Sequence, residues 1–355
     1  MAAGLRLHLP QNAGLLLAVG LFAAVYGLYT HLHPNGGSPA VLVQNANEAF
    51  ALVLVAMAQT VPVLTGGLDL SVGAMMTLVN CLASVVVNGS PLSIAGGIVL
   101  CLAVGLLGGF VNGCIIVYGR LQPIIVTLAT GAVFIGIALF LRPTPGGDVD
   151  GDLSFALTYD LVEFAAVYGL FDDGEAPWFA PIGWIPVPAL LLLAVVLAVW
   201  LPFRNSVLGR GCYAVGSSES AAYMSGVKVD RSKIAAYTLA GLFAAIGGLY
   251  LALQTGSGNA DVPQAGSYTH NSIAAAVIGG TSLYGGSGGA VGSIFGALVL
   301  RAISFNFRVF DADGPLGFLA DPLLQPLFEG CVLLLAVSLG AARVFRVRNR
   351  LQLFG

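Results

Sequence analysis

The chain has 355 residues, of which 57% are hydrophobic and only 9% are charged, and its mean hydropathy is +0.90. A soluble domain carries about 25% charged residues, so this composition excludes an ordinary globular protein. Apolar runs long enough to cross the roughly 30 Å hydrocarbon core of a bilayer recur along the whole chain. We therefore predict an all-α integral membrane protein. The formal net charge of −3 decides little, because the positions of Lys and Arg matter more than their sum.

The apolar runs predict about ten membrane-spanning helices, some of them short or interrupted, in a single transmembrane domain over 1–355. The expected spans lie near residues 13–32, 46–66, 71–87, 92–118, 122–141, 186–203, 234–254, 270–283, 287–306 and 323–342. The third and the eighth are short and rich in Gly. The first is expected to be retained, because residues 30–33 make a poor signal-peptide cleavage site.

Basic residues gather on one side of this arrangement. They are Arg6, Arg120, Arg204, Arg210, Lys228, Arg231 and Lys233, and in the tail 343–355 Arg343, Arg346, Arg348 and Arg350. The positive-inside rule makes this side cytoplasmic, and both termini are then cytoplasmic as well.

The connection 143–186 is expected on the opposite side and carries eight acidic residues without any Lys or Arg. Its apolar stretch 153–170 contains Asp160 and Glu163, so it is not counted as a span. We expect a solvated loop here, with an extramembrane cap or a docking surface as the alternative.

The sequence contains no motif that would make the chain an enzyme. HExxH, a nucleophile elbow and a phosphate-binding glycine loop are all absent, so no cofactor and no metal are expected in this chain. Wide spacing and apolar surroundings favour buried free thiols over disulfides or metal ligands for the five cysteines, Cys81, Cys101, Cys114, Cys212 and Cys331.

The segment 204–233 is the longest polar and basic stretch between apolar spans. Ser217 or Ser218 can cap a short helix, Glu219 suits its first turn, and Gly226 can end it in a left-handed conformation. About two helical turns are too short to be stable alone. We therefore expect this segment to dock on a partner, with a frayed loop as the alternative.

One acidic residue, Asp69, lies at membrane depth within the sequence TGGLDLSVG. A carboxylate at a helix centre costs about 2.5–3.5 kcal/mol, so it is expected to avoid lipid. Gly66 and Gly67 can end one helix, and Asp69 can cap the next by accepting from N–H groups near Val72. Interrupted helices often border the permeation path of transporters. A purely structural cap is the alternative interpretation of Asp69.

A second break, 279–286, lies in the other half of the chain, and both breaks are expected toward the cytoplasmic side, which does not support an inverted repeat. Neutral polar residues at membrane depth suit hydroxyl-bearing solutes, although interhelical hydrogen bonds explain them equally well. The candidates for a translocation path are Gln59, Gly66, Gly67, Asp69, Ser71, Asn80, Asn112 and Asn271.

Glycines spaced three or four residues apart predict close helix packing rather than a ligand site. They mark one face of the fourth span and dominate the eighth and ninth: Gly105, Gly108, Gly109, Gly113, Gly279, Gly280, Gly285, Gly286, Gly288, Gly289, Gly292 and Gly296.

Three motifs together resemble the permease subunits of bacterial ABC importers for monosaccharides of the ribose, xylose and galactose type, in the superfamily of branched-chain amino acid and sugar permeases. TGGLDLSVGA lies at 65–74, AVGSSESAAYMSGV at 214–227 and IAAAVIGGTSLYGGSGGAVGSIFGA at 273–297. They keep the order of that family, and the similarity extends over about 45–338.

The resemblance implies a permease subunit in the bacterial inner membrane that imports a neutral monosaccharide. A cytoplasmic ABC ATPase would bind ATP and Mg and dock on 204–233, and a periplasmic sugar-binding protein would deliver the sugar. Two permease chains would pair, as a homodimer or with a related chain, and no nucleic acid is involved. The residues expected to couple to the ATPase are Ser218, Glu219, Ala222, Tyr223 and Gly226, four of which share one helix side by their spacing.

Two departures from the family and three alternatives remain open. The connection 143–186 is longer and more acidic than expected, and Glu329 stands where relatives such as ribose permeases carry Lys. Related permeases carry branched-chain amino acids or nucleosides, which are alternative cargoes. A stand-alone carrier or channel is the alternative from a different class.

Overall fold

The structure is a computed structural model that describes residues 13–171 and 178–310, and a few positions beyond them, Asp321, Leu324, Leu327, Phe328, Gly330, Cys331 and Leu334. Most of the predicted span 323–342 lies outside the described residues, as do Glu329 and the tail 343–355. Within the described residues the regular elements are all helices. Two isolated β-bridges also occur there, between Gly146 and Gly258 and between Asp160 and Pro186.

The helices follow one another with short connections. The first group is α2 (Ala13–Leu32), α3 (Pro39–Leu64), α4 (Val72–Val86), α5 (Pro91–Tyr118) and α6 (Pro123–Leu141). Two short helices, α7 (Gly151–Thr158) and α8 (Leu161–Val167), and a 3-10 turn (Ala180–Ile182) come next. One long rod then combines α9 (Val187–Val195), a π-helical turn (Val196–Trp200) and α10 (Leu201–Asn205). The last group is α11 (Val207–Ser217), α12 (Glu219–Met224), α13 (Val229–Thr255), α14 (Val262–Ile278) and α15 (Ala290–Val309).

Seven helices in the described part of the chain are long and apolar enough to span a membrane. They are α2, α3, α5, α6, the α9–α10 rod, α13 and α15. The third and eighth predicted spans fall on α4 and α14, which have only 15 and 17 residues, so the expectation that both are short is confirmed. The described helices therefore support a multi-span protein with seven full-length spans.

Capping residues shift several helix starts away from the apolar runs. Ser38 accepts a hydrogen bond from the Val41 N–H and starts α3 at Pro39, well before the predicted 46–66. Asp261 likewise accepts from the Gln264 N–H at 3.0 Å and starts α14 at Val262. Hydropathy does not detect these polar first turns, because capping acts through single polar side chains.

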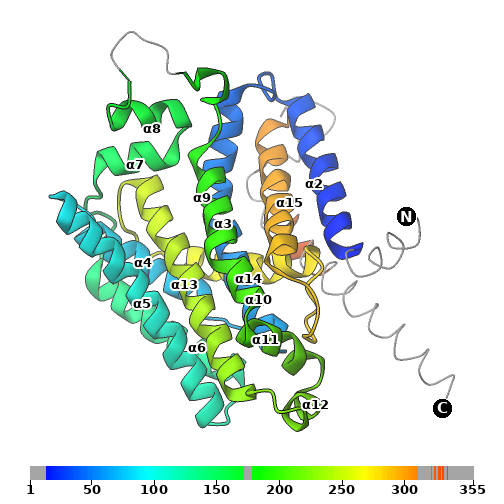
Figure 1. Ribbon diagram of the computed structural model, residues 1–355. Helices are drawn as coiled ribbons and strands as arrows, with labels where there is room; N and C mark the ends of the chain where they lie inside the picture. The colour runs from blue at the N-terminus through cyan, green and yellow to red at the C-terminus, as the bar shows by residue number, and fades with distance from the viewer. Residues whose placement is uncertain are drawn as a thin grey trace.

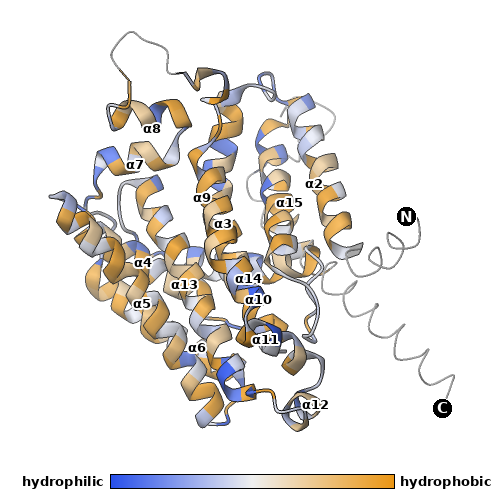
Figure 2. Cartoon of the chain, viewed as in Figure 1, coloured by the Kyte–Doolittle hydropathy of each residue, from blue (hydrophilic) through white to orange (hydrophobic). Residues whose placement is uncertain are grey.

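The centre of the molecule is made of α3 and α13, which pack on each other (Figure 1). Helices α5, α4 and α6 lie on one side, and α14, α15 and α2 on the other. Every residue of α3 from Ala49 to Leu64 is buried. By contrast, α5 and α6 expose large apolar side chains such as Val99, Leu128 and Phe140, and Figure 2 shows the resulting hydrophobic faces. Such faces suit contact with lipid.

Glycines bring the central helices into backbone contact. A Cβ on Gly109 would collide with the Tyr237 carbonyl, and one on Gly241 would collide with the Gly105 carbonyl, so α5 and α13 touch through their main chains. Gly279 and Gly292 make the same kind of contact between α14 and α15. The expected close packing at these glycines is confirmed.

The connection 143–186 folds into a cap rather than a solvated loop, so the expectation of a loop is wrong for its described part. Helices α7 and α8 bury Ala156 and Ala165, and the Val187 N–H donates to the Tyr159 carbonyl at 2.9 Å. The side chains of Asp150 and Asp160 cap the first turns of α7 and α8. In the sequence these two residues stand out only as part of an acidic stretch. The acidic residues at 172, 173 and 175 lie outside the described residues.

This cap and the α11–α12 segment lie at opposite ends of the molecule (Figure 1). Of the three arginines that the charge pattern does not place, Arg142 and Arg308 lie toward the cap end. Arg142 donates to the Ser84 carbonyl at 2.7 Å, and Arg308 pairs with Glu48 at 2.6 Å. Each is therefore held by an acceptor within the protein.

Replacing Gly241 with Ala should destabilise the fold, because the added methyl group meets the Gly105 carbonyl at the α5–α13 contact. Overpacking of this kind costs about 1–3 kcal/mol. Thermal unfolding of the purified protein in detergent measures the effect. Gly136→Ala is the matched control, since a Cβ there meets no atom within 4 Å. Equal unfolding midpoints for the two variants would contradict the packing argument.

Candidate functional site

Helix α3 ends at Leu64 in a tight turn that interrupts the central membrane-spanning helix. The Thr65 N–H and hydroxyl both donate to the Pro62 carbonyl, and Gly66 adopts φ +80°. A left-handed glycine ends the helix without steric cost. Helix α4 starts only at Val72, so the predicted break is confirmed. Residues 65–71 are called the α3–α4 joint below.

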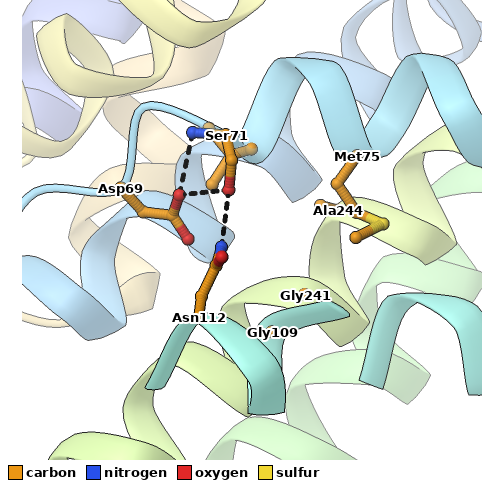
Figure 3. Close-up of a pocket in the computed structure, with 8 residues that line it drawn as sticks. Asp69, Ser71, Met75, Gly109, Asn112, Gly241 and Ala244 are labelled. Atoms are coloured by element: carbon orange, nitrogen blue, oxygen red, sulfur yellow. Dashed lines mark hydrogen bonds between the residues drawn. The ribbon is translucent and has the colours of Figure 1, made fainter. Parts of the chain in front are cut away.

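Asp69 lies buried in this joint and bonds to Ser71 (Figure 3). Its Oδ1 accepts from the Ser71 N–H at 2.8 Å and from the Ser71 hydroxyl at 2.6 Å. Asn112 of α5 donates from Nδ2 to the same Ser71 oxygen at 2.9 Å. Asp69 thus accepts from an N–H next to Val72, as expected, but the residue in the capping position of α4 is Ser71, so Asp69 is not the helix cap. The Asp69 side chain instead closes a tight turn by bonding to Ser71, two residues later.

Neighbouring helices complete the hydrogen bonds of the joint. The Leu70 N–H donates to the Thr127 hydroxyl of α6 at 3.0 Å, and the Gly73 N–H donates to the Thr269 hydroxyl of α14 at 3.2 Å. Gly67 lies so close to the Tyr237 hydroxyl of α13 that a Cβ would collide with it. Together with α5, which contributes Asn112, these contacts mean that four helices hold the joint in place.

Some buried polar atoms near the joint have no hydrogen-bond partner in the described part of the chain. They are the Asn112 Oδ1, the Tyr237 hydroxyl and, within α3, both amide atoms of Gln59. Figure 3 shows the residues that line the space between Asp69, Asn112 and the glycines of α5 and α13. This space is too narrow for a water molecule. The joint is closed in this conformation, and the unpaired atoms are available to water or solute only if the helices separate.

Among the other candidates for the translocation path, Asn80 lies apart from this cluster. Asn80 lies just past the middle of α4, where its Oδ1 accepts from the Asn259 N–H at 2.8 Å and anchors the connection between α13 and α14. Asn271 is half-buried in α14. The structure thus brings together Asp69, Ser71 and Asn112, with Gly67 beside them, and separates Asn80 from them.

The second break, between α14 and α15, lies directly against the first. The Gly286 N–H donates to the Leu64 carbonyl at 3.0 Å, which satisfies a carbonyl at the end of α3. Deeper in the membrane-spanning core, the Thr60 hydroxyl bonds to the Ser293 hydroxyl at 2.6 Å, and Thr281 lies within 3.4 Å of the same oxygen. The two breaks form one structural unit.

Helix α12 is a capped single helix of six residues at the end of the molecule opposite the cap. The Ser218 hydroxyl accepts from the Ala221 N–H, Glu219 pairs with Lys233 at 2.7 Å, and Gly226 adopts φ +79°. The expected start and end of this helix are confirmed.

The exposed side of α12 differs from the expected one. Tyr223 is 75% exposed and Met224 is 87% exposed, whereas Ala222 is only 5% exposed and packs with Val215 and Val229 of the same chain. The expectation that Ala222 shares an exposed side with Tyr223 is therefore wrong. Met224 is the exposed neighbour that sequence spacing did not select, because α12 is anchored by its alanine face.

Helix α11 is tied to the start of α13 by a cysteine. The Cys212 thiol donates to the Ser232 carbonyl at 3.3 Å. Burial raises the pKa of this thiol to about 12, so it stays protonated and keeps its hydrogen bond at neutral pH. Cys212 thus has a structural role in this segment.

A larger hollow of about 290 Å³ lies between α2, α3, α9 and α15, near the cap end. Its wall is almost wholly apolar and includes Phe22, Tyr26, Phe50, Phe305 and Asn45. Sequence reasoning missed this hollow. The i, i+4 spacing of Phe22 and Tyr26 was the available signal, but α2 is apolar on all sides and the spacing does not stand out.

Replacing Ser71 with Ala should destabilise the joint, since Asp69 loses a donor and the Asn112 amide loses its acceptor. Leaving buried polar groups unpaired costs about 1–3 kcal/mol. Thermal unfolding measures the loss, with the exposed Ser93→Ala of α5 as the control. An unchanged unfolding midpoint for Ser71→Ala would show that the three side chains do not form the bonded cluster.

Comparison with known proteins agrees with this architecture. The profile of the family described as branched-chain amino acid transport system, permease component, matches residues 41–337. The ribose import permease of Bacillus subtilis strain 168 is 33% identical over 323 residues, 90% of each chain. The ribose import permease of Escherichia coli K12 is 32% identical over 330 residues, 93% of each chain. The D-allose transport system permease of Escherichia coli K12 is 31% identical over 268 residues, 75% of each chain.

No solved structure shows a significant match to the chain. The resemblance drawn from the three sequence motifs is confirmed by the family profile and by these relatives. The matched region includes the α3–α4 joint, the second break and the α11–α12 segment. The chain belongs to the family of branched-chain amino acid transport system permease components, and it is a multi-pass membrane permease.

Proposed function

We propose that the chain is the membrane-spanning subunit of an ABC importer that moves a neutral monosaccharide into the cell. The names of its relatives support the cargo, since they import ribose or transport D-allose. ATP hydrolysis is assigned to a separate cytoplasmic ATPase. A periplasmic binding protein delivers the sugar, and a second permease chain completes the transporter.

One observation carries this proposal: the exposed pair Tyr223 and Met224 on a short capped helix. Large apolar side chains exposed outside the apolar spans favour a protein partner over solvent. Basic residues, including Arg210, Lys228 and Arg231, surround this helix in the chain. The positive-inside rule then makes this end cytoplasmic, where an ATPase would bind it.

The opposite end suits a different partner. The acidic cap built by α7 and α8 is ordered and exposes Tyr159, Tyr168 and Trp184. In the proposed orientation this surface faces the periplasm and is assigned to the binding protein. The negative charge of the cap favours a partner with a basic contact surface.

A neutral, hydroxyl-bearing cargo fits the buried polar groups better than an amino acid does. Asp69 is already bonded to Ser71, and the unpaired atoms nearby belong to neutral side chains, the Gln59 and Asn112 amides and the Tyr237 hydroxyl. Amides can both donate to and accept from sugar hydroxyls. A branched-chain amino acid, which the family description names, would bring two charges that these groups do not match.

Transport should depend entirely on the partners. Proteoliposomes that contain the chain with its ATPase, the binding protein and ATP are expected to accumulate labelled sugar, and those with the chain alone are not. Titration of the binding protein with a panel of pentoses, hexoses, nucleosides and branched-chain amino acids identifies the cargo. Uptake by the chain alone would refute the importer and favour a carrier or channel.

Replacing Gly226 with Val should uncouple ATP hydrolysis from transport without preventing insertion. A β-branched residue at φ +79° forces the end of α12 to rearrange. We expect about a tenfold loss of sugar transported per ATP, equivalent to about 1.4 kcal/mol.

Gly89→Val is the matched control for this change, because Gly89 has φ +93°, has no atom within 4 Å of an added Cβ, and precedes α5 toward the cap end. Both variants should lose similar stability, and only Gly226→Val should lose coupling. The same loss in both would mean that strain alone is responsible.

A further inference from the structure

The C-terminal end of α11 touches both breaks through main-chain atoms. A Cβ on Gly216 would collide with the Leu64 carbonyl oxygen and with the Gly286 nitrogen. A Cβ on Gly285 would lie 2.8 Å from the Gly216 Cα and 2.9 Å from the Gly66 nitrogen. The ends of α3, α11 and the second break therefore meet at one point, which we call the glycine junction (Gly66, Gly216, Gly285 and Gly286).

Hydrogen bonds hold the junction together. The Gly286 N–H donates to the Leu64 carbonyl at 3.0 Å, and the Tyr213 hydroxyl of α11 donates to the Gly288 carbonyl at 3.0 Å. Hence α11 is bonded to the second break, and the second break is bonded to α3. Since atoms at van der Waals contact cannot interpenetrate, α11 cannot move toward the breaks without moving them.

The junction is also continuous with the parts on either side of it. Toward the outside of the protein, Ser218 alone separates α11 from α12, whose Tyr223 is exposed. Toward the membrane, Gly66 and Gly67 lead directly into the Asp69–Ser71–Asn112 cluster. Positive-φ glycines at 66, 285, 286 and 288 are positions at which the main chain can pivot.

We propose that Gly216 is a positioning residue for coupling: without a side chain, it seats α11 on both breaks and passes displacement of α12 to the α3–α4 joint. This rests on the proposed function, because it takes α12 as the ATPase contact. The joint is closed and has unpaired polar atoms beside it, so a displacement there changes access to those atoms.

The test uses the assembled transporter with its ATPase and binding protein in proteoliposomes. Gly216→Ala is expected to lower the sugar transported per ATP by about tenfold, within the range of measured coupling energies. The ATPase should still assemble on the variant, since Tyr223 and Met224 are untouched. Gly136→Ala is the control and should keep the wild-type ratio, because its Cβ meets no atom within 4 Å.

A second variant removes a bond without adding volume. Tyr213→Phe lacks only the hydroxyl that reaches Gly288, so it should fold even where Gly216→Ala does not. We expect about a threefold loss in sugar per ATP, as for one hydrogen bond. A residue that merely stabilises the fold would lower the unfolding midpoint and leave this ratio unchanged.

The outcomes separate the two proposals. If both variants assemble and transport as much sugar per ATP as the wild type, the role of the junction is overturned and the importer is left intact. If Gly216→Ala does not assemble, a wild-type value in Tyr213→Phe has the same consequence. Uptake by the wild-type chain without ATPase would overturn the importer itself. A fall in the ratio in each assembled variant, with normal ATPase assembly and an unaffected control, supports the junction.

Discussion

The interruption of the central helix imposes the main constraint on this fold. Hydrocarbon offers no hydrogen bonds, so the main-chain groups freed between α3 and α4 must find partners inside the protein. Thr127 and Thr269 supply two of them from neighbouring helices, and the second break supplies an N–H to Leu64. Helices α6, α14 and α5 must therefore lie close to the joint. Glycine contacts between α5 and α13, and between α14 and α15, make that approach possible.

This arrangement gives the permease a closed centre and two distinct ends. At the joint, Asp69, Ser71 and Asn112 are bonded to each other with no room for water between them. Opening this region requires the helices to move apart, and in the proposed importer the ATPase would supply the work for that movement. The exposed α12 at one end and the acidic cap at the other provide separate surfaces for the proposed ATPase and binding protein.

Most of the fold could be predicted from hydropathy, while the helix ends and the cap could not. Long apolar helices such as α5 and α6 match their predicted ranges within one residue, because hydrophobicity over a long window identifies a span. Helix α3 starts seven residues before the predicted span, since a single residue, Ser38, decides where it begins. The sequence predicts a loop over 153–170, whereas two Asp caps and the packing of small alanines make it two helices.

The site divides in the same way. The sequence by itself determined the membrane class, the break around Asp69 and the short helix after Ser218, because each depends on hydrophobicity or capping within one continuous stretch. Only the tertiary structure decided that Asn112 bonds to Ser71, 41 residues away, that Ala222 faces inward, and that Gly216 seats α11 on both breaks. The contacts of Asn112 and Gly216 join helices distant in the chain, and their geometry arises from how close the backbones approach, which no local pattern encodes.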